Sequence, residues 1–167
     1  MKKNMVNLKL AQLKQYNIEV KMKIRVVNRN FVEQNQNILK KFNVISVFGN
    51  DSNCPVEVKV KHLLKLQFDD IIEETSSKIS FNDNLASQVK SFFERIKDNN
   101  LPLLVHCDAG ISRSGAIGYI ANEYFNKYLE NNFNDQEYFE KMNRHILPNP
   151  LVVRVLKNKL WGFENEK

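Results

Sequence analysis

One segment of the chain places a thiol and a guanidinium at the two ends of a short loop. Cys107 and Arg113 are separated by five residues: Asp108, Ala109, Gly110, Ile111 and Ser112. A thiolate is a strong nucleophile, and the planar guanidinium matches two phosphate oxygens in a way that a lysine cannot. Gly110 allows the backbone to turn tightly. The spacing therefore indicates a loop that binds a phosphate group and attacks it from sulfur.

The segments on either side of this loop predict a strand before it and a helix after it. A short apolar run precedes the loop: Leu101, Leu103, Leu104 and Val105. After Arg113 apolar residues recur at helical spacing: Ile117, Ile120, Ala121, Tyr124 and Tyr128. In such a unit the loop N–H groups and the positive end of the helix dipole point at one place. They favour a bound anion there, and the thiolate form of Cys107.

The rest of the chain alternates predicted strands with predicted helices. Strands are expected at 24–27, 44–48 and 63–68, with a turn at 49–53. Helices are expected at 31–42, 83–97, 136–144 and 151–160. Four apolar residues of the first helix are expected to face inward: Val32, Ile38, Leu39 and Phe42. The pattern predicts a single α/β domain with a central, mainly parallel sheet flanked by helices, and the phosphate-binding loop between a strand and a helix.

Length and composition describe an ordinary soluble domain. The chain has 167 residues, of which 43% are hydrophobic and 26% charged. Residues 1–20 follow no single period and are predicted to form an N-terminal extension of unknown role, followed by the domain at 21–163 and a tail at 164–167. No apolar run is long enough to cross a bilayer, and no signal-peptide core follows the basic N-terminus. We therefore expect a cytoplasmic protein that binds no membrane.

The cysteine count and the net charge limit the cofactors and partners. Cys54 and Cys107 are too few for a disulfide framework, and no residues have the spacing of metal ligands. We expect no metal or cofactor, and a free, uninvolved thiol at Cys54. The net charge of +6 and the pI near 9.3 suit anionic partners, but the lysines are spread along the chain without a dense run. A nucleic-acid partner is therefore less favoured, and nothing in the sequence indicates an oligomeric state.

The loop also resembles a known signature. The segment His106 to Ser114 resembles the H-C-x5-R-S/T motif of the cysteine-based protein tyrosine phosphatases, and Ala-Gly-Ile-Ser-Arg-Ser is most similar to their small dual-specificity branch. Residues 64–70 resemble the strand that leads into the general-acid loop, and 148–154 resemble the last segment of compact phage and bacterial members. The resemblance covers roughly residues 22–160 and implies a metal-independent phosphatase with a cysteinyl-phosphate intermediate.

The resemblance implies a role for each residue of the motif. Cys107 is the nucleophile, and Arg113 holds the phosphate oxygens together with the amides of residues 108–112. His106 supports the loop by hydrogen bonding and tunes the thiolate. Ser114 stabilises the thiolate that leaves when the phosphoenzyme breaks down.

A general acid must come from a separate loop, because a poor leaving group needs a proton as its P–O bond breaks. Asp69, Asp70 and Asp83 are the candidates between the preceding strand and Cys107. Asp83 is explained by its place at a predicted helix start. Asp70 continues the strand face of Leu66 and Phe68, and Phe-x-Asp resembles the acid-bearing segment of compact members. We predict Asp70 as the acid, with Asp69 as the alternative.

The loop composition indicates the class of substrate. Asp108 lies beside the nucleophile, and no lysine stands between Cys107 and Arg113. A carboxylate there repels densely charged ligands, which disfavours inositol lipids. We predict a phosphoprotein substrate carrying phosphotyrosine, with phosphoserine and phosphothreonine also open. The alternatives are an RNA 5′-triphosphatase, which the basic pI keeps open, and a phosphate-binding pseudophosphatase.

Overall fold

The computed structural model describes residues 22–50, 56–129 and 133–162. The predictions for the extension at 1–20, for most of the turn at 49–53, for Cys54 and for the tail at 164–167 lie outside these residues. No helix within the described ranges is both long and apolar enough to span a bilayer.

Four parallel strands form the central sheet. Their spatial order is β1-β4-β2-β3. The strands are β1 (Ile24–Asn28), β2 (Asn43–Phe48), β3 (Leu63–Gln67) and β4 (Leu103–Cys107). In this register Asn28 pairs with Cys107, and Phe48 pairs with Gln67. Because the strands are parallel and end level with one another, the segments that follow them meet at one edge of the sheet.

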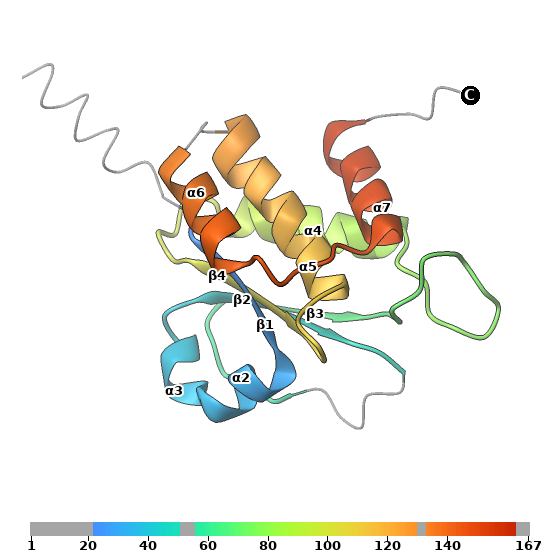
Figure 1. The fold of residues 1–167 in the computed structure, drawn as a ribbon, viewed down its shortest axis with the longest axis horizontal. Helices are drawn as coiled ribbons and strands as arrows, with labels where there is room; N and C mark the ends of the chain where they lie inside the picture. Colours follow the sequence, from blue (N-terminus) through green and yellow to red (C-terminus); the bar gives the residue numbers. More distant parts are fainter. Residues whose placement is uncertain (1–21, 51–55, 130–132, 163–167) are drawn as a thin grey trace, which may run out of the picture.

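Helices cover both faces of this sheet (Figure 1). Two short helices lie on one face: α2 (Arg29–Gln34) and α3 (Gln36–Leu39). The other face carries α4 (Asp83–Ile96), α5 (Arg113–Asn122) with its π-helical continuation η1 (Glu123–Leu129), α6 (Phe133–Met142) and α7 (Pro150–Trp161). Two layers of helices therefore enclose the sheet, which confirms the predicted α/β class.

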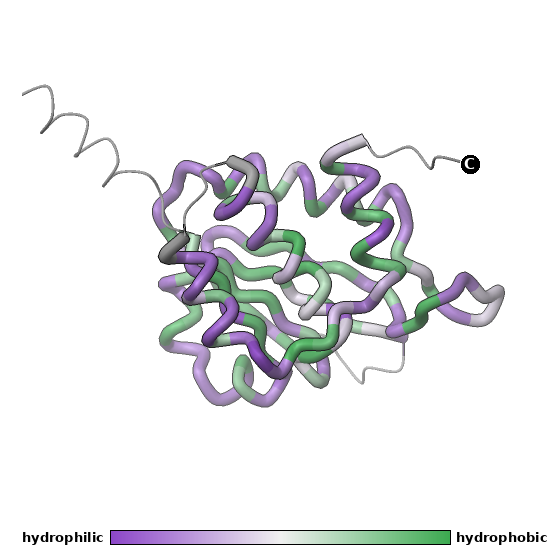
Figure 2. Tube along the Cα trace, turned by 45° about the horizontal axis from the view of Figure 1, so that its top comes forward, coloured by the Kyte–Doolittle hydropathy of each residue, from purple (hydrophilic) through white to green (hydrophobic). Residues whose placement is uncertain are grey.

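Two apolar cores pack against the sheet, one on each face. The larger lies under α4, α5, α6 and α7, and its largest fully buried side chains include Phe68, Phe81, Phe92 and Phe93. The smaller lies under α2 and α3 and contains Val27, Val32, Leu39, Val44 and Leu104. Apolar stretches accordingly follow the strands in Figure 2, with hydrophilic stretches along the outer parts of the helices. Strand β4 is buried on both faces, so it positions its last residue, Cys107, rigidly.

The predicted helix at 31–42 is wrong, because the chain forms two short helices that meet at Asn35. The Asn35 side chain donates to the carbonyl oxygen of Phe31 at 2.8 Å, and its backbone N–H donates to the carbonyl oxygen of Val32. These bonds end the first helix, as expected of a residue that competes with helical hydrogen bonding. Val32 and Leu39 are buried as predicted, whereas Ile38 is 36% exposed.

A side chain covers the outer edge of β1. Asn143 Oδ1 accepts from the Val26 N–H at 2.7 Å, and Asn143 Nδ2 donates to the Ile24 carbonyl oxygen at 2.9 Å. The ring nitrogen Nε2 of His145 lies 3.1 Å from the Val26 carbonyl oxygen. The segment after α6 thus satisfies the polar groups of an edge strand that would otherwise offer a template for another chain.

We predict that Asn143→Ala lowers the free energy of unfolding by about 3 kcal/mol, because it leaves buried backbone groups of β1 without partners. Urea unfolding measures the change. The matched control is Asn84→Ala on the exposed side of α4, for which we expect a change within about 0.5 kcal/mol. Equal, small losses in the two variants would contradict the role of Asn143.

Candidate active site

The predicted phosphate-binding loop connects β4 to α5 and folds around the sulfur of Cys107. The Gly110 N–H donates to Cys107 Sγ at 3.3 Å, and Ser114 Oγ lies 3.0 Å from the same sulfur. Cys107 is buried, and Arg113 and Ser114 are the first residues of α5. The structure therefore brings Cys107, Arg113 and Ser114 together at a helix N-terminus. Backbone donors and the helix dipole favour a bound anion there.

Gly110 is the one loop position that cannot carry a side chain. Its φ is +69°, and a Cβ built on it would lie 2.5 Å from the Asn28 nitrogen and from the Val27 carbonyl carbon. The loop passes this close to β1 because the Arg29 N–H donates to the Asp108 carbonyl oxygen at 3.2 Å. The end of β1 therefore sets the position of the loop.

Arg113 lies at the mouth of the loop with its guanidinium fixed from two sides. Nη1 donates to the Phe68 carbonyl oxygen at 3.1 Å, and Nη2 donates to Asp108 Oδ2 at 2.9 Å. The residue is 7% exposed, and its buried Nε has no hydrogen-bond partner within the described chain. The guanidinium therefore has one side on the backbone and the other on a carboxylate, while its Nε remains for an anion.

Asp70 reaches the loop from the segment that follows β3. Its Oδ1 accepts from Ser112 Oγ at 2.7 Å and from Asn149 Nδ2 at 2.8 Å. Both bonds fall on the same oxygen, which leaves Oδ2 as the atom that can carry a proton. The carboxyl group is exposed, so a ligand on the loop can reach it. The structure therefore brings the carboxyl group of Asp70 beside the loop.

Asp69 has a different environment from Asp70. It is 6% exposed and accepts from the backbone N–H groups of Asn50 at 2.8 Å and Ile79 at 2.7 Å. The two backbone hydrogen bonds, with smaller contributions from the charges of Lys78 and Arg113, outweigh burial and lower the pKa of Asp69 below its usual value. An ionised carboxylate held by two amides is suited to fixing the backbone, not to donating a proton.

The strand alternation that led to Asp70 does not extend that far. Strand β3 ends at Gln67, and the buried pair Phe68 and Asp69 interrupts the alternation before Asp70. The side chain of Asp70 is positioned by Ser112 and Asn149 instead.

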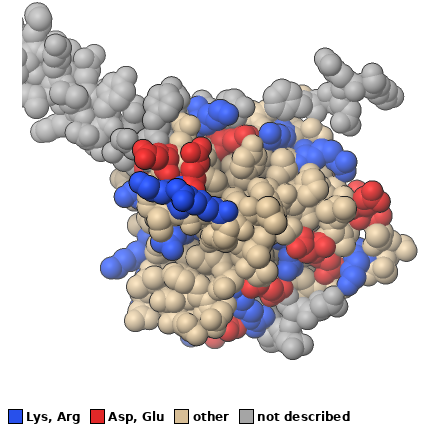
Figure 3. Space-filling model, viewed as in Figure 1, with Lys and Arg blue, Asp and Glu red and all other residues tan. Residues whose placement is uncertain are grey.

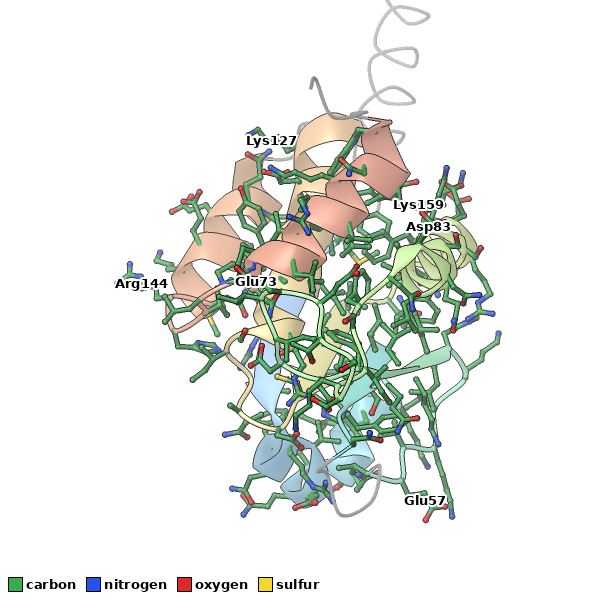
Figure 4. The ribbon with its side chains drawn as sticks, turned by 90° about the vertical axis from the view of Figure 1, so that its right-hand side faces the viewer. Glu57, Glu73, Asp83, Lys127, Arg144 and Lys159 are labelled. Atoms are coloured by element: carbon green, nitrogen blue, oxygen red, sulfur yellow. The ribbon has the colours of Figure 1, made fainter. Side chains whose placement is uncertain are left out.

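Asp83 is separate from the loop. It is the first residue of α4, where Asn82 is the N-cap, and its carboxylate pairs with Lys159 of α7 at 2.6 Å. Figure 4 shows Asp83 and Lys159 together at this helix end. The predicted role at a helix start is confirmed, and the ion pair between α4 and α7 adds to it.

His106 does not make the hydrogen bonds that the resemblance implies. It is 2% exposed, and neither ring nitrogen makes a hydrogen bond of normal geometry. Burial lowers the pKa of His106 from 6.5 to about 4, and the nearby backbone of Cys107 and the charges of Asp108 and Glu33 offset only part of this fall. The imidazole is thus a neutral, buried group beneath the loop.

Asn149 is the residue that sequence reasoning missed. It lies directly before α7, which begins at Pro150. The buried Asn149 also caps α7, since its Oδ1 accepts from the Leu151 and Val152 N–H groups, while its Nδ2 holds Asp70 and the Ile71 carbonyl oxygen. An asparagine directly before a helix-initiating proline is an N-cap signal. The contacts of Asn149 Nδ2 with Asp70 and Ile71 join residues far apart in the sequence, and no local sequence signal predicts them.

A pocket of about 200 Å³ opens beside the loop. It is lined by Gly49, Asp69, Asp70, Ile71, Lys78, Asp108 and Arg113. A larger, more open depression of about 570 Å³ lies between β3 and α4 and contains no residue of the loop. We assign the site to the smaller pocket, because Arg113 and Asp70 meet there. Among the described residues no three His, Cys, Asp or Glu side chains gather to hold a metal ion.

Comparison with known proteins agrees with this geometry. No family model matches the chain. The human tyrosine phosphatase-like serine/threonine/tyrosine-interacting protein superposes with a TM-score of 0.58 at 18% identity, over 81% of this chain and 89% of that one. The chain therefore shares the fold of this tyrosine phosphatase-like protein.

Two curated relatives are similar in sequence. The mouse tyrosine-protein phosphatase non-receptor type 14 is 32% identical over 110 residues, or 55% of this chain and 9% of that protein. The variola virus dual specificity protein phosphatase OPG106 is 33% identical over 87 residues, or 42% of this chain and 48% of the viral protein. The match thus spans about half of the viral relative and a small part of the mouse relative.

We predict that His106 makes stability depend on pH between 6.5 and 4. The unfolded chain binds a proton at its imidazole below about pH 6.5, whereas the folded chain does so only near pH 4. The stabilisation is therefore complete above pH 6.5 and is lost as the pH falls to 4, by about 3 kcal/mol in total.

Urea unfolding of the wild type and of His106→Asn between pH 7 and pH 4 measures this loss. The variant is expected to show a flatter profile. His62→Gln, at a half-buried position before β3, is the control that removes another histidine and keeps the wild-type slope. Parallel profiles for wild type and His106→Asn would refute the assignment.

Proposed function

We propose that this chain is a metal-independent phosphoprotein phosphatase that hydrolyses phosphotyrosine, and also phosphoserine and phosphothreonine, through a cysteinyl-phosphate intermediate. The observation that carries the proposal is the sulfur of Cys107, which has the Gly110 N–H and Ser114 Oγ at 3.3 and 3.0 Å and lies in one loop with Arg113. The relatives named above are themselves tyrosine and dual specificity phosphatases.

In the first step the thiolate of Cys107 attacks phosphorus and forms an S–P bond as the P–O bond to the leaving group breaks. Arg113 and the loop amides hold the other phosphate oxygens while charge redistributes. The proton on Asp70 Oδ2 passes to the leaving oxygen. The bonds from Ser112 and Asn149 to Oδ1 keep the acid over the loop during this transfer.

In the second step water attacks the phosphorus and the S–P bond breaks. Asp70, now ionised, takes a proton from the water, so that one carboxyl group serves both steps. The departing Cys107 thiolate receives a hydrogen bond from Ser114 Oγ, which lies 3.0 Å away. Inorganic phosphate leaves and the thiolate is regenerated.

The rim of the site supports a polypeptide substrate. Three large apolar side chains are exposed there: Ile72 at 64%, Ile111 at 38% and Leu147 at 73%. Their segments are joined, because the Leu147 N–H donates to the Ile111 carbonyl oxygen at 3.1 Å and Asn149 Nδ2 donates to the Ile71 carbonyl oxygen. An apolar rim suits the side chains that flank a phosphorylated residue.

The charge distribution favours a protein substrate over RNA. On the face shown in Figure 3, Lys and Arg lie interspersed with Asp and Glu and form no continuous basic track. Three carboxylates, Asp69, Asp70 and Asp108, line the pocket, which disfavours a triphosphate. A pseudophosphatase is disfavoured because both Cys107 and Arg113 are present.

We predict that Cys107→Ser abolishes turnover of an aryl phosphate while phosphate binding survives, because the hydroxyl is a far weaker nucleophile of nearly the same size. Arg113→Lys should lose at least about a hundredfold in kcat/KM, since the charge remains but the paired donor geometry is lost. The assay compares an aryl phosphate, a phosphopeptide panel and triphosphate-ended RNA in the presence of a chelator.

Phosphopeptides are expected to be the best substrates in that comparison. A clear preference for the RNA would favour the triphosphatase, and phosphate binding without any turnover would favour the pseudophosphatase. Appreciable activity in Cys107→Ser would rule out the covalent mechanism.

We predict that Asp70→Asn slows hydrolysis of alkyl phosphates by roughly a hundredfold or more, with a smaller loss for activated aryl phosphates, because only the poorer leaving group depends on the proton. The basic limb of the pH–rate profile should also disappear. Asn149→Ala should reduce kcat in the same leaving-group-dependent way but less severely. Asp69→Asn is the neighbouring control, and a leaving-group signature there but not in Asp70→Asn would reassign the acid.

A further inference from the structure

The proposed mechanism gives no task to the carboxylate of Asp108, although this group contacts the phosphate-binding arginine. Asp108 Oδ2 accepts from Arg113 Nη2 at 2.9 Å. The Asp108 side chain is 43% exposed, whereas that of Arg113 is 9% exposed. The pair thus consists of a fixed guanidinium and a more exposed carboxylate that has room to move.

The contact falls on one particular edge of the guanidinium. The Nε–H and one Nη2–H of an arginine point in the same direction and together bind two oxygens of a phosphate. Nη1 of Arg113 is engaged elsewhere, by the Phe68 carbonyl oxygen at 3.1 Å. Nε is buried and has no partner in the described chain. The donors that remain for a phosphate are therefore Nε and Nη2, and Nη2 is already bonded to Asp108.

A second arginine lies on the other side of the same carboxylate. Arg29 Nη1 is 3.9 Å from Asp108 Oδ1, while Arg29 Nε bonds Glu33 at 2.7 Å. The Arg29 side chain is 28% exposed and belongs to α2, whose first N–H also holds the loop at Asp108. A carboxylate that leaves Arg113 can therefore stay paired by moving toward Arg29.

We propose that Asp108 is an internal competitor for phosphate on Arg113, and that Arg29 receives it when phosphate binds. This inference rests on the proposed function and concerns the affinity of the same site. An incoming phosphate displaces Asp108 Oδ2 from Nη2, and the carboxylate closes onto Arg29 Nη1. When the product phosphate leaves, Asp108 returns to Arg113. The exchange weakens binding of the product and favours its release.

The alternative for Asp108 is a purely orienting role, in which it holds Arg113 in place for the ligand. The two roles predict opposite results. Removing a competitor strengthens phosphate binding, whereas removing an orienting group weakens it. The effect of Arg29 also separates competition from simple repulsion, because the proposal routes that effect through Asp108.

The test is calorimetric titration of inorganic phosphate into the full chain, as wild type, Asp108→Asn, Arg29→Gln and the double variant. We expect Asp108→Asn to bind phosphate about tenfold more tightly and Arg29→Gln to bind it about threefold more weakly. The double variant should match Asp108→Asn, because Arg29 has no carboxylate left to receive. Asp108→Ala serves as a second variant, and thermal unfolding checks that each protein is folded.

Glu73→Gln is the charge-matched control. Glu73 is exposed on the loop that follows Asp70 (Figure 4), and its neutralisation should change the phosphate affinity less than twofold. Unchanged or weaker binding in both Asp108 variants would overturn the proposal. The proposal would also be overturned if Arg29→Gln lowered the phosphate affinity equally in the wild type and in Asp108→Asn. A tenfold gain in phosphate affinity in Glu73→Gln would overturn it as well.

Turnover of an aryl phosphate is measured on the same proteins. If the phosphate affinities of the four proteins follow the expected order but the wild type hydrolyses no substrate, this inference is supported and the proposed function is refuted. If the wild type turns over substrate but Asp108→Asn binds phosphate no more tightly than the wild type, the proposed function is supported and this inference is refuted. A wild type that binds no phosphate refutes both.

Discussion

The parallel register of the sheet is the constraint on which the site depends. Asn28 lies beside Cys107, and Phe48 lies beside Gln67, so all four strands end at one edge. The segments that follow supply Arg29, Gly49, Asp70 and the phosphate-binding loop. A shift of one residue between β1 and β4 would separate the Arg29 N–H from the Asp108 carbonyl oxygen. It would also move Gly110 away from the backbone of Val27 and Asn28, against which it now packs. The geometry of the candidate site is thus a direct consequence of strand pairing.

Hydrogen bonds then join segments that are far apart in the sequence. Ser112 connects the loop to Asp70, and Asn149 connects Asp70 to the start of α7. The Asn149 N–H also donates to the Ser112 carbonyl oxygen at 3.1 Å. These contacts form a closed circuit of three segments around Asp70. A carboxyl group on an exposed loop gains a fixed position in this way without being buried, so it remains accessible to a ligand.

The sequence was sufficient for features that depend on local pattern. The apolar run before Cys107, its spacing from Arg113 and the helical periodicity that follows predicted the strand, the loop and the helix correctly. The break at Asn35 was missed because the apolar spacing continues across it, while the hydrogen bonds that end the helix come from a side chain. The environments of Asp69 and Asp70 could not be derived either, since they depend on Ile79 and Asn149, which are distant contacts. His106 illustrates the same limit: its burial follows from sheet packing, not from the motif.

The pairing between Asp69 and Ile79 has an evolutionary consequence. The Asp69 N–H donates to the Ile79 carbonyl oxygen at 2.8 Å, and Asp69 Oδ2 accepts from the Ile79 N–H at 2.7 Å. These two bonds close the base of the excursion that carries Ile72 and Glu73. Insertions, deletions and substitutions at positions 72–77 need not disturb the residues on either side. This stretch can therefore vary in sequence and length while the residues that line the pocket keep their positions.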